Sequence, residues 1–160
     1  MAEFHAAVDR LLKLEGGMAD HPADRGGLTK FGISQRAYPN LSIAALTEAQ
    51  ARAIYQRDYW DPYFERLDQP VANKLFEMAV HLGKARAIRL VQETLQANGA
   101  PHLTIDGTFG AQTLMALKLA PGPTLLRALR ARLADHYVDL VREDPAQLAF
   151  LKGWMRRVLA

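Results

Sequence analysis

The sequence contains no cysteine, which excludes disulfide bonds, thiol catalysis and cysteine-ligated metal sites. It also has no uninterrupted apolar run of about 18 residues, so we expect no transmembrane helix. The N-terminal segment carries Glu3 and Asp9 instead of a cationic start and does not resemble a secretory signal. We therefore expect synthesis in the cytoplasm and a separate export route for any target beyond it.

Signatures of metal and cofactor chemistry are missing as well. No GxSxG sequence and no glycine-rich phosphate loop after a strand occurs. The histidines show no HExxH or other metal-ligand spacing. We accordingly expect neither a metal nor a cofactor. The histidines are His5, His21, His81, His102 and His136.

The remaining composition is that of an ordinary soluble protein, but its charge is unevenly distributed. The chain has 160 residues, of which 49% are apolar and 23% charged, enough for one domain or two small ones. Residues 1–80 hold 9 Lys/Arg against 11 Asp/Glu, a net charge of −2, whereas residues 81–160 hold 11 against 6, a net charge of +5. The positive half favours a polyanionic partner, although a solvated mixed-charge surface explains the charge equally well.

The first informative stretch is an amphipathic helix that leads to a carboxylate. Phe4, Val8, Leu11 and Leu12 repeat at helical spacing, and Glu15 continues the same apolar stripe. Partial burial of a carboxyl raises its pKa, which suits a general acid that works near neutral pH. On periodicity alone, a charge that reaches solvent is the commoner interpretation.

A glycine-rich segment with a second acid and a threonine follows. Gly16 and Gly17 predict the end of the helix and leave space beside Glu15. Asp24 lies nine positions after Glu15, and it suits both a turn before two glycines and a catalytic partner. Thr29, five positions later, could hold an attacking water or bond its hydroxyl to backbone.

Together these residues resemble the glycoside hydrolase 108 family, whose members are lysozyme-like N-acetylmuramidases. The resemblance rests on EGG at Glu15 and on the pattern DxGGxTxxGI. It implies that Glu15 is the catalytic acid, that Asp24 and Thr29 act with it, and that Gly27 lies near the substrate. The pattern consists of Asp24, Gly26, Gly27, Thr29, Gly32 and Ile33.

The sequence departs from this family downstream. Glu77, Met78, His81 and Leu82 stand where the family more often has Asp, Phe, Asn and a small residue before a glycine. This difference puts any contact of these positions with substrate in doubt.

Aromatic residues gather between positions 55 and 64. Tyr55, Tyr59 and Trp60 are candidates for binding N-acetyl sugars at a groove edge, because their rings are amphipathic. A partly buried position in the core is the somewhat commoner alternative.

Apolar periodicity and capping residues predict a mainly α fold, and the family resemblance implies a lysozyme-like one. The segment 28–34 is a candidate short β-hairpin, but its alternation is too brief to decide. Thr47 and Gln50 form a capping box, Asp68 and Pro70 open a helix, and Gly83 ends it. The other helices are expected at 84–96, 111–119, 124–142 and 145–159.

The second half contains another recognisable pattern, DGxxGxxT, formed by Asp106, Gly107, Gly110 and Thr113. With Gln92 before it and residues 150–154 near the end, it resembles the predicted peptidoglycan-binding domain that usually follows the muramidase domain. The resemblance implies a catalytic region at 1–92 and a peptidoglycan-binding region at 93–160 that packs against it.

These observations favour a monomeric peptidoglycan hydrolase that cleaves the β-1,4 bond between N-acetylmuramic acid and N-acetylglucosamine. Such a lysozyme serves as a phage endolysin, reaching the wall through a holin-type route, or as a secretion-associated muramidase. The alternative from another class is a non-catalytic peptidoglycan-binding module. Nucleic acid is not an expected partner, because the basic residues are spread over several helices.

Overall fold

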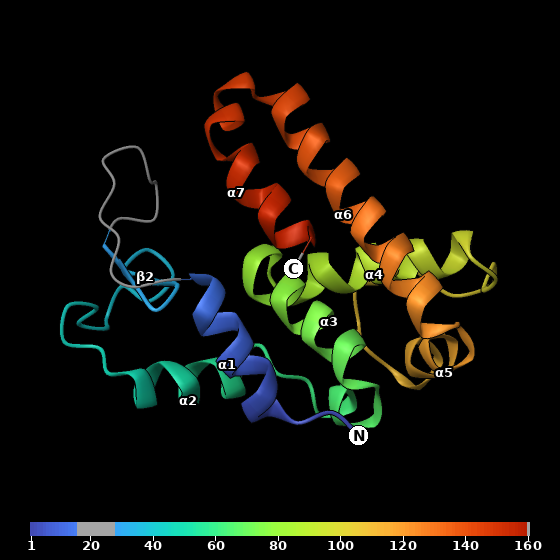
Figure 1. The fold of residues 1–160 in the computed structure, drawn as a ribbon, viewed down its shortest axis with the longest axis horizontal. Helices are drawn as coiled ribbons and strands as arrows, with labels where there is room; N and C mark the ends of the chain where they lie inside the picture. The colour runs from blue at the N-terminus through green and yellow to red at the C-terminus, as the bar shows by residue number, and fades with distance from the viewer. Residues whose placement is uncertain (16–27, 160) are drawn as a thin grey trace.

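The structure is a computed structural model that describes residues 1–15 and 28–159 (Figure 1). The described residues form seven α-helices, two 3-10 helices (η) and one two-stranded antiparallel sheet. The mainly α fold predicted from the sequence is thus confirmed. In chain order the elements are α1 (Phe4–Glu15), β1 (Thr29–Lys30), β2 (Ile33–Ser34), α2 (Glu48–Asp58), η1 (Pro62–Arg66), α3 (Gln69–Leu82), α4 (Lys84–Ala97), α5 (Ala111–Leu119), α6 (Gly122–Glu143), η2 (Pro145–Gln147) and α7 (Leu148–Leu159).

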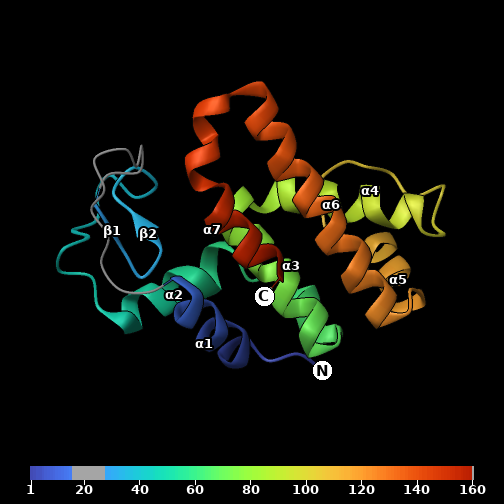
Figure 2. The same cartoon turned by 45° about the horizontal axis from the view of Figure 1, so that its top comes forward.

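Helix α1 has the apolar face that its sequence predicts. Phe4, Val8 and Leu11 are buried, whereas Asp9 and Arg10 on the other face are exposed. The helix ends at Glu15, on the side of the molecule that carries the sheet (Figures 1 and 2). The predicted stripe therefore docks α1 on the core and directs its last turn toward the hairpin.

The segment 28–34 is a β-hairpin, which resolves the alternative left open by the sequence. Thr29 pairs with Ser34 and Lys30 with Ile33. The turn between the strands consists of Phe31 and Gly32, whose φ angles are 52° and 78°. Positive φ at both central residues matches the right-handed twist of a tight hairpin, and glycine adopts it without strain.

Helix ends follow the predicted capping chemistry at several places. Thr47 and Gln50 form the reciprocal capping box of α2. Asp68 precedes α3, which has a proline in its first turn and ends before Gly83 at a φ of 78°. Pro62 begins η1 after Asp61, whose side chain accepts a hydrogen bond from the Tyr63 backbone.

The helix expected at 145–159 is divided in the structure. Pro145–Gln147 form the 3-10 helix η2, and α7 begins only at Leu148. Asp144 accepts a hydrogen bond from the Ala146 backbone, as an N-cap residue does.

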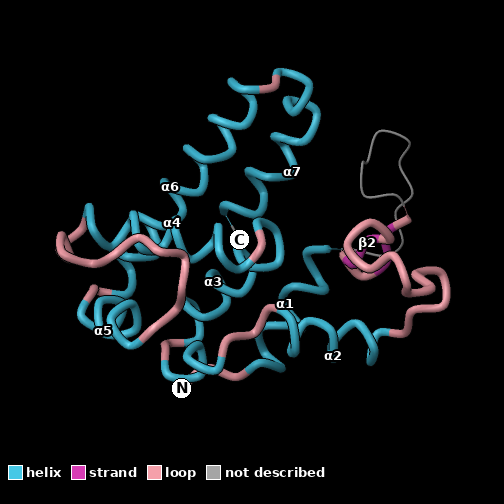
Figure 3. The backbone as a smooth tube through the Cα atoms, turned by 180° about the vertical axis from the view of Figure 1, so that it is seen from behind, coloured by secondary structure: helices cyan, strands magenta, loops and turns pink. Residues whose placement is uncertain are grey.

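One continuous apolar core joins the two halves of the chain and extends from Ala2 to Val158. Helix α3 is central, because it packs against α1, α4, α6 and η1. The hairpin, α1 and α2 lie on one side of it, α5 lies on the other, and α6 and α7 extend from it at the top of the views (Figures 1 and 3). Edge-on contacts of Trp60 with Phe4, Phe64 and Phe76 fill the space between α1, η1 and α3.

Candidate active site

The predicted catalytic residues belong to the end of α1, the start of the hairpin and the chain segment that connects them. Glu15 is the last residue of α1, and Thr29 is the first residue of β1, where its side chain is half-buried. The side chain of Glu15, and Asp24, Gly26 and Gly27 entirely, lie outside the described residues. The structure therefore defines the framework on either side of the acidic segment.

The hairpin turn is fixed to α2 by a hydrogen bond. The Tyr55 hydroxyl donates to the Phe31 carbonyl oxygen at 2.6 Å. Lys30 Nζ donates to the Ala44 carbonyl oxygen at 3.0 Å and lies 5.6 Å from the centre of the Phe31 ring. These contacts hold a non-glycine residue at positive φ, a conformation that persists only where its surroundings enforce it.

The loop after the hairpin is held in the same way. Gln35 Nε2 lies within hydrogen-bond distance of the carbonyl oxygens of Tyr38, Pro39 and Leu41, at 3.2, 3.0 and 2.9 Å. The Tyr38 hydroxyl donates to Asp58 Oδ2 at 2.7 Å, which connects this loop to the end of α2. Helix α2 thus supports both the hairpin and the loop that follows it.

The charges at the end of α2 reinforce this connection. Burial raises the pKa of Tyr38, and its hydrogen bonds with Tyr59 and Asp58 raise it further. The hydrogen bond from Arg57 lowers the pKa of Asp58 below its ordinary value. Tyr38 therefore remains a neutral donor and Asp58 a charged acceptor around neutral pH, so the pair suits a structural role.

The three aromatic candidates occupy different environments. Tyr55 and Trp60 are 1% and 6% exposed, so neither presents a ring face to solvent. Tyr59 is partly exposed, and its ring lies 5.9 Å from that of Tyr55. Of the three, Tyr59 alone has a partly exposed ring, and its contact with a sugar stays a prediction.

The positions at which the sequence departs from the family are tied to the C-terminal helix. Glu77 is buried and accepts a hydrogen bond from Lys74 at 2.9 Å. Lys74 also donates to the Arg157 carbonyl oxygen at 2.7 Å, and burial lowers its pKa. His81 Nε2 accepts from Arg157 Nε at 2.8 Å. In this chain, the Glu77 and His81 side chains contribute to an α3–α7 contact. Met78 is buried and Leu82 partly buried, both against the core.

The DGxxGxxT residues surround the side chain of Gln92, which is 1% exposed. Gln92 Nε2 contacts Asp106 Oδ1 at 2.9 Å and Thr113 Oγ1 at 3.2 Å, while its Oε1 accepts from the Gly107 backbone at 2.9 Å. Hydrogen bonds from Gln92 and the Thr108 backbone lower the pKa of Asp106. The pattern thus fastens the loop before α5 onto α4, and its buried members are not free to contact a ligand.

Sequence reasoning missed the contacts that join distant segments. The Tyr38–Asp58 and Tyr55–Phe31 hydrogen bonds span 20 and 24 positions of the chain. No local periodicity signals such contacts. The sequence analysis likewise did not predict the buried pair Lys74 and Glu77. Their opposite charges at i, i+3 on a helix weakly indicate an ion pair, but not its burial.

Two general properties bear on the chemistry. None of the helices in the described part of the chain is both long and apolar enough to span a membrane. Within residues 1–15 and 28–159, no group of three or more His, Asp or Glu residues is arranged as a metal site.

Comparison with known proteins identifies both halves of the chain. Residues 8–83 match the family described as glycosyl hydrolase 108, and residues 86–159 match one described as a predicted peptidoglycan domain. The matches meet at the α3–α4 turn, whereas the boundary near residue 92 stays a prediction. No curated protein matches the chain.

A solved structure extends the similarity over almost the whole chain. It is the structure of Brucella abortus SagA, 31% identical, with a TM-score of 0.78, covering 97% of this chain and 88% of that one. The match includes both halves, so the arrangement of the two regions is shared. The chain therefore belongs to the glycosyl hydrolase 108 family and carries a C-terminal predicted peptidoglycan domain.

Proposed function

We propose that this glycosidase is an N-acetylmuramidase that hydrolyses the β-1,4 bond between N-acetylmuramic acid and N-acetylglucosamine in peptidoglycan. Glu15 protonates the leaving glycosidic oxygen, and Asp24 with Thr29 places or activates the water. The observation that carries the proposal is that the glycosyl hydrolase match over residues 8–83 includes the whole Glu15, Asp24 and Thr29 pattern.

The described framework supports these roles. Glu15 ends a helix packed on the core, and Thr29 begins a strand whose turn is held by Tyr55. Catalytic groups need stable mutual positions, because small displacements reduce the rate strongly. The attachment of α1 to the core and of the hairpin to Tyr55 is what supports the proposed roles of Glu15 and Thr29.

The second half suits attachment to the substrate polymer. Its match to a predicted peptidoglycan domain and its net charge of +5 favour an anionic cell wall. The proposal therefore places a monomeric enzyme at the cell wall, reached by holin-type or specialised export, in a phage endolysin or a secretion-associated muramidase.

Release of reducing ends from purified peptidoglycan tests the proposal. The wild-type protein should release new reducing ends with N-acetylmuramic acid at the terminus, and Glu15→Gln should abolish release while the protein still binds walls. N-acetylglucosamine at the new terminus would contradict the assigned bond. Binding of walls without release of any reducing end would favour the alternative, a non-catalytic peptidoglycan-binding module.

A further inference from the structure

Helix α7 is attached to the rest of the protein along one side only. It packs mainly on α6 and η2, at the edge of the molecule (Figures 1 and 2). Val158 is the one residue of this helix that is fully buried. Trp154 is partly buried and stacks on Tyr137 of α6, with ring centres 4.9 Å apart. The other side of α7 faces solvent.

That side carries large apolar side chains. Leu148 is 60% exposed and Leu159 is 76% exposed. Met155, which is partly buried, lies seven positions after the first and four before the second, so the three follow one line along the helix. Phe150 is turned away from this line and stacks on Trp154. Covering the exposed line with apolar groups is favourable, because it removes apolar surface from water.

Two exposed cations lie beside this apolar line. Helix α7 contains Lys152, Arg156 and Arg157 and no acidic residue. Arg157 donates a hydrogen bond to His81, whereas Lys152 and Arg156 are exposed and form no ion pair with any residue in the described ranges. Their long apolar stems can lie along neighbouring apolar groups while the charges reach an anion. This side of α7, defined by Leu148, Lys152, Met155, Arg156 and Leu159, is called the α7 surface below.

Acidic side chains on the neighbouring segments do not pair with these cations. Asp139 pairs with Arg142 within α6 at 3.1 Å. Asp144 accepts hydrogen bonds from the Ala146 backbone and the Gln147 side chain, at the start of η2. The charge of the α7 surface is therefore positive and available to a partner.

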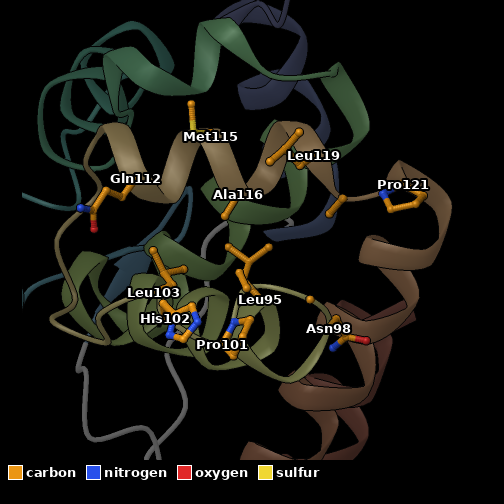
Figure 4. A pocket seen from close by; sticks show the side chains of 13 residues that line it. Leu95, Asn98, Pro101, His102, Leu103, Gln112, Met115, Ala116, Leu119 and Pro121 are labelled. Carbon is orange, nitrogen blue, oxygen red and sulfur yellow. The ribbon is translucent and has the colours of Figure 1, made fainter.

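Helix α5 shows by contrast what an exposed apolar surface without charge looks like. Met115 and Leu119 are 66% and 79% exposed and line a groove between the end of α4 and α5 (Figure 4). The lining of this groove includes no Lys, Arg, Asp or Glu. The groove therefore has no electrostatic preference for a partner, whereas the α7 surface combines apolar groups with unpaired cations.

We propose that the α7 surface binds the face of an anionic phospholipid membrane, with the helix lying parallel to it. Leu148, Met155 and Leu159 enter the boundary between headgroups and acyl chains, while Lys152 and Arg156 contact phosphate oxygens. The 12 residues of α7 extend only about 18 Å, less than a hydrocarbon core of about 30 Å, so the association is peripheral. The proposal goes beyond the muramidase assignment and does not depend on it.

Co-sedimentation of the full-length protein with lipid vesicles tests the proposal. One set of vesicles contains phosphatidylethanolamine and phosphatidylglycerol, and the other contains phosphatidylcholine alone. Wild type should bind the anionic vesicles about twentyfold more tightly, because each of the two cations contributes about fivefold. Raising the salt concentration to about 0.5 M should remove most of this preference.

Two double variants separate the apolar contribution from the charged one. Lys152→Gln with Arg156→Gln should remove the preference for anionic vesicles. Leu148→Asn with Leu159→Asn should weaken binding to anionic vesicles about tenfold or more. Thermal melts should be unchanged, because all four side chains are exposed.

Matched controls make the same chemical changes on other helices. Met115→Asn with Leu119→Asn removes two exposed apolar side chains from α5. Lys118→Gln with Arg127→Gln removes two exposed cations, one from α5 and one from α6. Both control variants should bind anionic vesicles as wild type does.

Several results would overturn the proposal. These are the absence of wild-type binding to anionic vesicles, equal binding to both kinds of vesicle, and equal losses in the α7 variants and their controls. A dimer in solution that only the α7 leucine variant abolishes, without vesicle binding, assigns the surface to a second copy of the chain. Loss of binding to purified, lipid-free walls by the α7 cation variant, again without vesicle binding, assigns its charges to the wall. Release of reducing ends from the same lipid-free walls tests the muramidase assignment separately.

Discussion

At the scale of single residues, burial separates side chains that look equivalent in the sequence. Tyr55, Tyr59 and Trp60 lie within six positions, yet only Tyr59 is partly exposed. The sequence could show that these residues are aromatic and close together. It could not show which ring faces solvent, because that depends on Phe4 and Phe76, contributed by α1 and α3.

Asp24 offers the sharpest residue-scale test of the catalytic assignment. Asp24→Asn should lower the rate of reducing-end release by about a hundredfold or more, because an amide cannot act as a base. Asparagine still forms the turn that aspartate forms, so the fold should be unchanged. Turnover within about tenfold of wild type would assign Asp24 to turn formation alone. A circular dichroism melt provides the control for folding.

At the scale of elements, residues close in sequence predict where helices begin and end. They do not predict which distant element holds a given segment in place. The capping box at Thr47 and the glycine stop at Gly83 were predictable because their residues are close in sequence. The hairpin was left open because each strand has two residues, too few for an alternating pattern. Its stability comes from α2, which lies outside the segment.

The hairpin's attachment predicts a specific cost. Tyr55→Phe removes the hydroxyl that donates to Phe31 and leaves a carbonyl oxygen without that donor. We expect a loss of about 1–2 kcal/mol in the free energy of unfolding and a lower kcat. Urea denaturation and reducing-end assays measure the two effects.

Tyr63→Phe is the matched control for this prediction. Tyr63 is half-buried, and its hydroxyl makes no hydrogen bond with a residue the structure describes. Its removal should change stability by less than about 0.5 kcal/mol. Equal effects of the two substitutions would show that the Tyr55 hydrogen bond does not hold the hairpin.

A second element-scale prediction concerns the loop before α5. Gly107 has a φ of 78°, and a Cβ there would lie 2.9 Å from the Ala85 carbonyl oxygen. Gly107→Ala should therefore destabilise the protein by about 2 kcal/mol or more, through both strain and a clash with backbone. Gly110→Ala is the control, since no neighbouring atom lies within 4 Å of its added Cβ. Similar melting temperatures for both variants would contradict this account of the DGxxGxxT pattern.

At the scale of the whole molecule, the buried Lys74 connects the two halves. Its Nζ contacts Glu77 on α3 and the Arg157 carbonyl oxygen on α7. From the sequence alone, a lysine within an apolar helical pattern is expected to be solvent-exposed. Burial of its charge is costly unless hydrogen bonds or an opposite charge compensate for the lost water. One of those partners, the Arg157 carbonyl oxygen, lies 83 positions further along the chain, so only the folded structure reveals it.

Breaking this contact should loosen the C-terminal helix. Lys74→Met leaves the Glu77 carboxylate buried without its cation, which should cost about 3–5 kcal/mol. Lys74→Met combined with Glu77→Leu removes both charges and should recover most of that loss. Urea denaturation of the two variants and wild type measures the difference. A double variant less stable than Lys74→Met would contradict the view that an unpaired buried charge causes the loss.

The same lysine predicts how stability depends on alkaline pH. Burial lowers the pKa of Lys74 below its ordinary value of 10.5, so the folded protein releases this proton before the unfolded chain does. Between the two pKa values the unfolded chain binds more protons, and the contribution of Lys74 to stability therefore rises with pH in that window. Subtracting the unfolding free energy of Lys74→Met from that of wild type follows the contribution, because the variant lacks the amine that titrates in this window. The difference should grow from pH 8 to pH 10 in favour of wild type; a difference that is constant or shrinks would show that burial does not penalise the Lys74 charge.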